Sequence, residues 1–112
     1  MKTGIELITE ERQRQINIEG YDVQHDSHHS PRQLIQAADT YLGSADLTLH
    51  SKEFSDTDKW HKTNLPFYRN EIKRNWPWEE ESFKPTTDIR DLIKAGALIA
   101  AAIDRLQAQN GE

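Results

Sequence analysis

Cysteine is absent from this 112-residue sequence, so a disulfide framework and any metal site built on thiolates are excluded. Basic residues are outnumbered, because 14 Lys and Arg stand against 19 Asp and Glu and leave a net charge of −5. General nucleic-acid binding requires a basic face that displaces counterions, and the charge balance argues against it. The lack of cysteine also fits a cytoplasmic protein.

Long apolar stretches are missing as well. Residues 1–11 contain no apolar segment of the kind that a signal peptide needs, so we expect none. The longest apolar run, residues 95–103, is about half of the ~20 residues required by a membrane-spanning helix. We therefore expect no membrane partner. Glycine-rich phosphate loops of the G-x-G-x-x-G and G-x-x-x-x-G-K-[ST] kinds do not occur either.

Apolar residues are few for a chain of this length. Hydrophobic residues make up 35% and charged residues 29%, so one domain spanning residues 1–112 would have a lean core. A monomer with such a core is marginally stable, which favours an oligomer or a fold stabilised by a ligand.

Helical periodicity predicts an all-α fold with three main helices. The first covers residues 4–19 and carries a thin apolar stripe of Ile5, Ile8 and Ile16; Thr9 could instead cap a later start. The second begins at a capping box formed by Ser30 and the glutamine three residues later, and it ends at residue 43, a glycine.

The last helix is expected over residues 88–109, with Thr87 as its N-cap. Small residues at 95–97 and 100–101 allow another helix to approach closely, and we expect a homodimer or larger oligomer through this helix. Its large aliphatic residues fall near one stripe: Ile89, Leu92, Ile93, Ile99, Ile103 and Leu106. Residues 44–75 show no clean period and predict a partly irregular insert, with a short helix interrupted or begun at Pro66.

Aromatic and cationic residues gather in three segments, residues 10–26, 75–85 and 90–99, which suggests a site for a flat, anionic small molecule. Tyr21, Trp76 and Trp78 are candidates for stacking on a nucleobase. The alternative is that the tryptophans anchor the middle segment to the helices.

Lys84, Arg90 and Lys94 flank the start of the last helix and could hold phosphates. Equally, they could form salt bridges with neighbouring acids. Arg12 and Arg14 could line a charged pocket wall or lie on a solvated helix face, and Arg12 would need a partner if it were buried.

A histidine-rich cluster surrounds His25, Asp26 and His28. Three interpretations remain open: a surface loop, a loop that contacts the sugar or base edge of a ligand, and a site for Zn²⁺ or another divalent ion. The spacing matches no established zinc motif.

Much of the sequence resembles a family of small, uncharacterised phage and prophage proteins. The resemblance rests on residues 11–16, 19–21, 25–26, 34–41, 76–78, 84–85 and 90–106, and it omits residues 44–72. Phage genomes carry small proteins that bind nucleotide second messengers of host immunity, so the resemblance implies a role of that kind in the host cytoplasm.

A weaker similarity joins the chain to MazG-type nucleotide pyrophosphohydrolases, all-α enzymes that hold Mg²⁺ with an E-x-x-E pair. Here the residue three positions after Glu11 is Arg14, and Ala102 stands where we expect glutamate in the phage family.

Taken together, the sequence favours a binder that sequesters a nucleotide-derived molecule without chemistry and without a cofactor. Eleven residues are candidates for ligand contacts: Arg12, Arg14, Tyr21, His25, Asp26, His28, Trp76, Trp78, Lys84, Arg90 and Lys94. One alternative is a Mg²⁺-dependent nucleotide pyrophosphohydrolase or phosphodiesterase using Glu10, Glu11, Asp26 and Asp39. A second alternative is an inhibitor that binds a host protein through the acidic, aromatic middle segment.

Overall fold

The computed structural model describes residues 1–19, 29–54 and 59–111. This part of the chain contains four α-helices and no strand: α1 (Gly4–Glu19), α2 (Pro31–Phe54), α3 (Lys59–Lys73) and α4 (Asp88–Gln109), with a short 3₁₀ turn, η2, at Glu80–Ser82. The expected all-α fold is confirmed. None of the described helices is long and apolar enough to cross a membrane.

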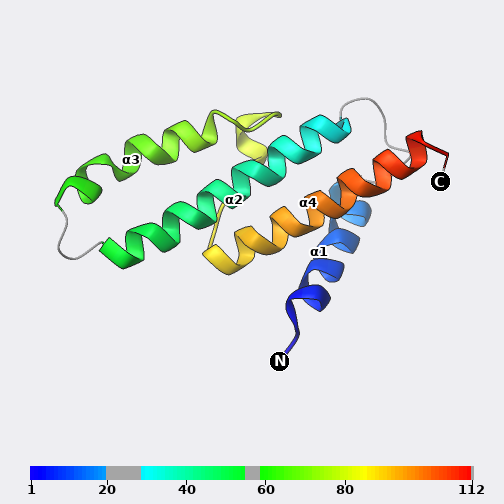
Figure 1. Cartoon of the computed structure of the whole chain (residues 1–112), viewed down its shortest axis with the longest axis horizontal. Coiled ribbons are helices and arrows are strands. Elements are labelled where there is room, and N and C mark those ends of the chain that lie inside the picture. Colours follow the sequence, from blue (N-terminus) through cyan, green and yellow to red (C-terminus); the bar gives the residue numbers. More distant parts are fainter. Residues whose placement is uncertain (20–28, 55–58, 112) are drawn as a thin grey trace.

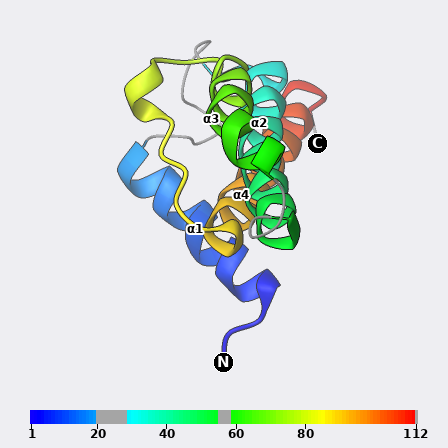
Figure 2. The same cartoon turned by 90° about the vertical axis from the view of Figure 1, so that its left-hand side faces the viewer.

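The long helices α2 and α4 lie side by side and run antiparallel (Figure 1). Helix α3 packs along α2, and α1 packs across α4. The segment between α3 and α4 returns on the side of the α2–α4 pair where α1 lies, as Figure 2 shows. Helix α1 and this segment therefore cover the same side of the pair.

The core between α2 and α4 is built mainly from small side chains. Leu34 and Leu98 are the large aliphatic residues buried there. Five buried alanines belong to the same cluster: Ala37, Ala38, Ala95, Ala101 and Ala102. Small side chains let two helix backbones approach closely, and this explains how the pair packs with so few large residues.

Side-chain caps fix where the helices begin. The Ser30 hydroxyl accepts from the amide of Gln33 at 3.2 Å and the Gln33 side chain accepts from the amide of Ser30 at 3.2 Å, which confirms the capping box. Thr87 caps α4, as predicted. The Thr9 alternative is wrong, because its hydroxyl donates to the carbonyl of Ile5 inside α1.

The predicted end of the second helix at Gly43 is also wrong. Helix α2 continues to Phe54, and a Cβ at Gly43 would lie 3.5 Å from Ile72 of α3. That distance is an ordinary contact, so Gly43 lies inside α2 next to α3 without being required by their packing. Residues 44–75 are largely helical where the structure describes them, and Pro66 lies inside α3 at an exposed position.

The predicted apolar stripes of α1 and α4 are only partly buried. In α1, Ile8 and Ile16 are half-buried, and Ile8 packs against Gly96 of α4. Ile5 is exposed, and the face that α1 buries is polar, with Glu11, Arg12 and Gln15. In α4, Ile93 is buried while the other large residues of the stripe are exposed. The small residues of α4 pack inside the chain, so they do not form the free surface that the sequence suggested for an oligomer.

Candidate anion-binding pocket

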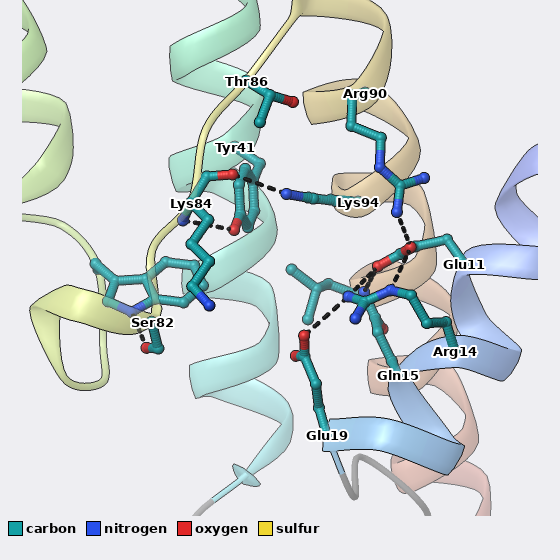
Figure 3. A pocket seen from close by; sticks show the side chains of 12 residues that line it. Glu11, Arg14, Gln15, Glu19, Tyr41, Ser82, Lys84, Thr86, Arg90 and Lys94 are labelled. Carbon is teal, nitrogen blue, oxygen red and sulfur yellow. Dashed lines mark hydrogen bonds and ion pairs between the residues drawn. The ribbon is translucent and has the colours of Figure 1, made fainter.

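A pocket of about 300 Å³ lies where α1, α2, α4 and the segment before α4 meet (Figure 3). Its walls carry four cationic side chains and two carboxylates. The lining residues are Glu11, Arg14, Gln15, Glu19, Tyr41, Trp76, Ser82, Lys84, Thr86, Arg90, Lys94 and Leu98. Five of the predicted site residues are therefore brought together: Arg14, Trp76, Lys84, Arg90 and Lys94.

Glu11 is the buried centre of the charged network. Its carboxylate accepts two hydrogen bonds from Arg14, at 2.9 and 2.7 Å, one from Gln15 at 3.3 Å and one from Arg90. Burial alone would raise the pKa of Glu11, but the Arg14 and Arg90 guanidinium groups outweigh burial and hold that pKa below its usual value. Glu11 therefore fixes one arginine from α1 and one from α4 beside the pocket.

Arg14 is held from two sides. Besides its bonds to Glu11, it donates to Glu19 at 2.8 Å. The hydrogen bond to Glu11 is the main reason that the pKa of Arg14 lies above its usual range. Its guanidinium is thus positioned before any ligand arrives.

Lys94 projects into the pocket from α4, one turn after Arg90. Its ammonium group donates to the carbonyl of Lys84 at 2.7 Å and lies 5.4 Å from the centre of the Tyr41 ring. Burial, followed by repulsion from Arg90, lowers the pKa of Lys94. An anion in the pocket would favour the charged form of this lysine.

Tyr41 joins the pocket to the core. Its hydroxyl accepts from the amide of Lys84 at 3.1 Å, and burial raises its pKa to about 12. The phenol therefore stays neutral near pH 7. This contact fixes the backbone of Lys84, whose exposed side chain extends beside the pocket (Figure 3).

One polar atom in the pocket wall lacks a partner. Gln15 is buried, and its Nε2 donates to Glu11 while its Oε1 accepts no hydrogen bond. A flipped amide would place Oε1 against the Glu11 carboxylate, so the assignment follows from the network. An unpaired buried acceptor carries an energetic cost.

The start of α4 is pinned by a buried carboxylate. Asp91 accepts from the Ser44 hydroxyl at 3.0 Å and from the amide of Thr86 at 2.9 Å. These bonds tie the segment before α4 to α2. They fix the first turns of α4 against α2. Arg90 and Lys94 point to the same side of α4 because they are four residues apart.

The predicted tryptophans lie mainly in the core. Trp76 is buried, donates its indole N–H to Ser82 Oγ at 2.9 Å, and packs edge-on against Tyr41 at 5.3 Å between ring centres. Trp78 packs on Trp76 and on His29, outside the pocket. Trp76 therefore lines the pocket from within the core, whereas Trp78 packs against that core and is not a lining residue.

The remaining candidates lie elsewhere. Arg12 points away from the pocket and donates to Asp104 of α4 at 3.1 Å, which supplies the partner that its burial requires. Tyr21, His25, Asp26 and His28 fall outside the residues that the structure describes.

Sequence reasoning missed Gln15, Tyr41 and Thr86 as lining residues. From the sequence, Glu11 is a candidate metal ligand or a salt-bridge partner on a solvated helix face; its burial as the centre of the network is not predicted.

Of the acids proposed for a Mg²⁺ site, Asp26 lies outside the described residues, and the three described ones do not form a metal-binding group. Glu10 pairs with Lys2, and Asp39 accepts from Asn75 at 3.1 Å. Within residues 1–19, 29–54 and 59–111, no three histidine or acidic side chains lie close enough to hold a metal ion. The described geometry thus offers cations and hydrogen-bonding groups to a ligand.

Similarity to known proteins was sought at three levels. No protein-family model, no curated protein and no solved structure matches this chain. Evidence that the chain binds a ligand therefore comes from the pocket itself.

Proposed function

We propose that this protein binds a small phosphorylated molecule, of the kind derived from a nucleotide, in the pocket between α1 and α4, and that it holds this molecule without altering it. The observation that carries the proposal is the gathering of Arg14, Arg90, Lys94 and Lys84 around one cavity. The chain as a whole carries a net charge of −5, so this concentration of positive charge is local.

The cations are held in place before binding. Glu11 fixes Arg14 and Arg90, and the Lys84 carbonyl fixes Lys94. Since these groups lose little freedom when an anion arrives, more of the interaction energy is available for affinity. Charge-assisted hydrogen bonds to phosphate are also the stronger ones.

The size of the cavity restricts the ligand. A volume of about 300 Å³ lies at the low end of the roughly 300–1,000 Å³ that small-molecule sites span. It favours a molecule with a single nucleobase, such as a nucleoside monophosphate or ADP-ribose, over a cyclic dinucleotide with two.

The resemblance to phage proteins extends the proposal to a biological role. A small binder that sequesters a nucleotide signal would lower its free concentration and silence the host response that depends on it. An immune signalling nucleotide in the host cytoplasm is the target that we propose.

The hydrolase alternative is less favoured. Glu11, its main metal ligand, is occupied by two arginines and Gln15. Displacing both arginines from a buried carboxylate would be costly. Divalent ions are therefore not expected to be required for binding.

The test is a thermal-shift screen with nucleoside monophosphates, ADP-ribose and cyclic dinucleotides, each with and without Mg²⁺. We expect a rise in Tm with a monophosphate or ADP-ribose, independent of Mg²⁺, and recovery of the intact molecule after heating. A Mg²⁺-dependent shift with cleaved product would favour the hydrolase. No shift with any compound would contradict the proposal and favour the host-protein inhibitor.

A double variant assigns the binding to this pocket. Arg90→Ala with Lys94→Ala should weaken affinity by 10-fold or more, because charged hydrogen bonds contribute about 1.5–3 kcal/mol each. The matched control is Lys73→Ala with Arg74→Ala, which removes the same charge from surface pairs with Glu80 and Glu71. Equal affinity of the two double variants for the ligand would show that the ligand does not bind in this pocket.

A further inference from the structure

The α2–α4 pair places its small residues inside and many of its large aliphatic residues outside. Alanines fill most of the interface between the two helices, whereas eight Ile and Leu side chains on them are between 40% and 65% exposed: Ile35, Leu42, Leu49, Ile89, Leu92, Ile99, Ile103 and Leu106. Burying Ile or Leu yields far more free energy than burying Ala. In a stable monomer, the Ile and Leu side chains would be expected to be buried and the alanines exposed.

The exposed residues form two parallel rows. Ile35, Leu42 and Leu49 are seven apart on α2, and Leu92, Ile99 and Leu106 are seven apart on α4. Seven residues are close to two helical turns, so each row runs straight along its helix.

The two rows lie on the same side of the pair. In each helix, the exposed row lies about a quarter turn around the helix axis from the residues that face the other helix. The row is displaced in the direction in which residue numbers increase. Because the two helices run antiparallel, the same displacement brings both rows to the same side of the pair. The Ser44–Asp91 hydrogen bond sets the register and brings Leu42 roughly level with Leu92.

No described helix covers this side. Helix α1 and the segment before α4 both lie on the opposite side of the α2–α4 pair, and the two views agree on this (Figures 1 and 2). The eight aliphatic residues therefore form one contiguous apolar face, called here the open face.

The central stretch of α4 is free of charge. Its cationic residues before that stretch, Arg90 and Lys94, point into the pocket, and Asp104 after it pairs with Arg12. From residue 95 to residue 103 no charged side chain occurs. A charge-free aliphatic strip of this kind is typical of the buried centre of an interface.

We propose that a second copy of this chain covers the open face, so that two α2–α4 pairs form a symmetric four-helix arrangement. The face is self-complementary, because its rows of aliphatic residues can interdigitate with the same rows of a copy related by a two-fold axis. From the exposed fractions, each copy would bury on the order of 700 Å², close to the ~800 Å² per partner of a standard interface.

A lipid surface fits the same face less well. Asp39 and Asp46 flank the row on α2, each four residues after one of its members. Interfacial helices that bind anionic lipids instead carry Lys and Arg beside their apolar face. The inference does not rest on the proposed ligand, since the pocket lies on the other side of the pair.

Sedimentation equilibrium from 1 to 200 µM tests the proposal. We expect the full-length chain to form a dimer and Ile99→Glu with Ile103→Glu to be a monomer, with at least a 100-fold weaker dimer constant. The control, Ile18→Glu with Phe67→Glu, adds the same charge at exposed sites of α1 and α3 and should remain dimeric. A monomeric wild-type chain, or a double variant at 99 and 103 that still dimerises, would overturn the proposal.

A second measurement keeps the test valid if the glutamate variant does not fold. Because the chain has no cysteine, Ile99→Cys introduces a single thiol at the centre of the open face. Its rate of modification by a thiol reagent should fall at least 5-fold between 1 and 200 µM protein, whereas the rate for Ile18→Cys should not change. Equal rates for Ile99→Cys at both concentrations would contradict the dimer.

Discussion

The two sides of the α2–α4 pair differ in almost every property. One side is covered by α1, carries a pocket with four cations, and buries charged groups such as Glu11 and Asp91. The other is an uncovered face of eight aliphatic side chains. Burial in this chain therefore does not follow hydrophobicity: polar groups lie inside where they have partners, and apolar groups lie outside where a second surface can cover them.

The two sides are suited to different functions, the recognition of an anion on one side and association with a second copy on the other. Polar groups that are buried and mutually bonded are fixed in place, and fixed charges suit the recognition of an anion. An exposed aliphatic face gains its stability only on association. Variants on the two sides should accordingly have different consequences.

The largest effect on folding is expected from Glu11→Ala. The change leaves Arg14, Arg90 and Gln15 without their shared acceptor, and breaking a buried ion pair costs about 3–5 kcal/mol. Both arginines are partly exposed and can turn toward water, so we expect the free energy of unfolding, measured with urea, to fall by about 3 kcal/mol. Glu10→Ala, one residue away and exposed, should cost less than about 1 kcal/mol. Equal losses would mean that the Glu11 network does not stabilise the fold.

A smaller loss of stability is expected from Gly96→Ala, which tests the packing of α1 on α4. A Cβ there would lie 2.6 Å from Cδ1 and 2.9 Å from Cγ1 of Ile8. Overpacking lowers the free energy of unfolding by about 1–3 kcal/mol, and the better helix propensity of alanine raises it by about 1 kcal/mol. We therefore expect a net loss of about 1 kcal/mol by thermal unfolding. In an Ile8→Ala background the same change should be neutral or stabilising; an unchanged penalty there would contradict the close approach.

The effect of pH on anion binding should be smaller still. Because the pKa of Lys94 is lowered, this residue loses its charge at a lower pH than an ordinary lysine. Affinity for AMP or ADP-ribose should therefore fall as the pH rises through that lowered pKa, by less than 10-fold because Arg90 stays charged. Lys94→Arg should flatten the profile at pH values below 10.5, the ordinary pKa of lysine. A profile that is the same in both proteins would show that Lys94 does not contact the anion.

The bounds of the first and last helices and the caps at Ser30 and Thr87 could be read from the sequence, because these depend on nearby residues. Helix α3 and the second half of α2 could not. Their buried contacts are sparse, and Gly43, a common helix terminator, instead lies inside α2. The residues around a glycine do not show whether the glycine ends a helix or lies inside it.

The candidate site was predictable in its cations but not in its organisation. The spacing of Arg90 and Lys94 indicated one shared face, and both line the pocket. The roles of Glu11, Gln15 and Tyr41 depend on contacts between distant segments, which no local spacing encodes. For the same reason, Arg12 could not be separated from Arg14, although one pairs with Asp104 and the other lines the pocket.

Calorimetric titration of AMP and ADP-ribose into three proteins tests the central claim most directly, namely that the cationic side binds a phosphorylated ligand. The proteins are the wild-type chain, Arg90→Ala with Lys94→Ala, and Ile99→Glu with Ile103→Glu. We expect at least one of the two compounds to bind the wild type and the open-face variant within a factor of three, and the pocket variant at least 10-fold more weakly. Equal binding to the wild type and the pocket variant, or no binding of either compound to the wild type, would contradict the claim.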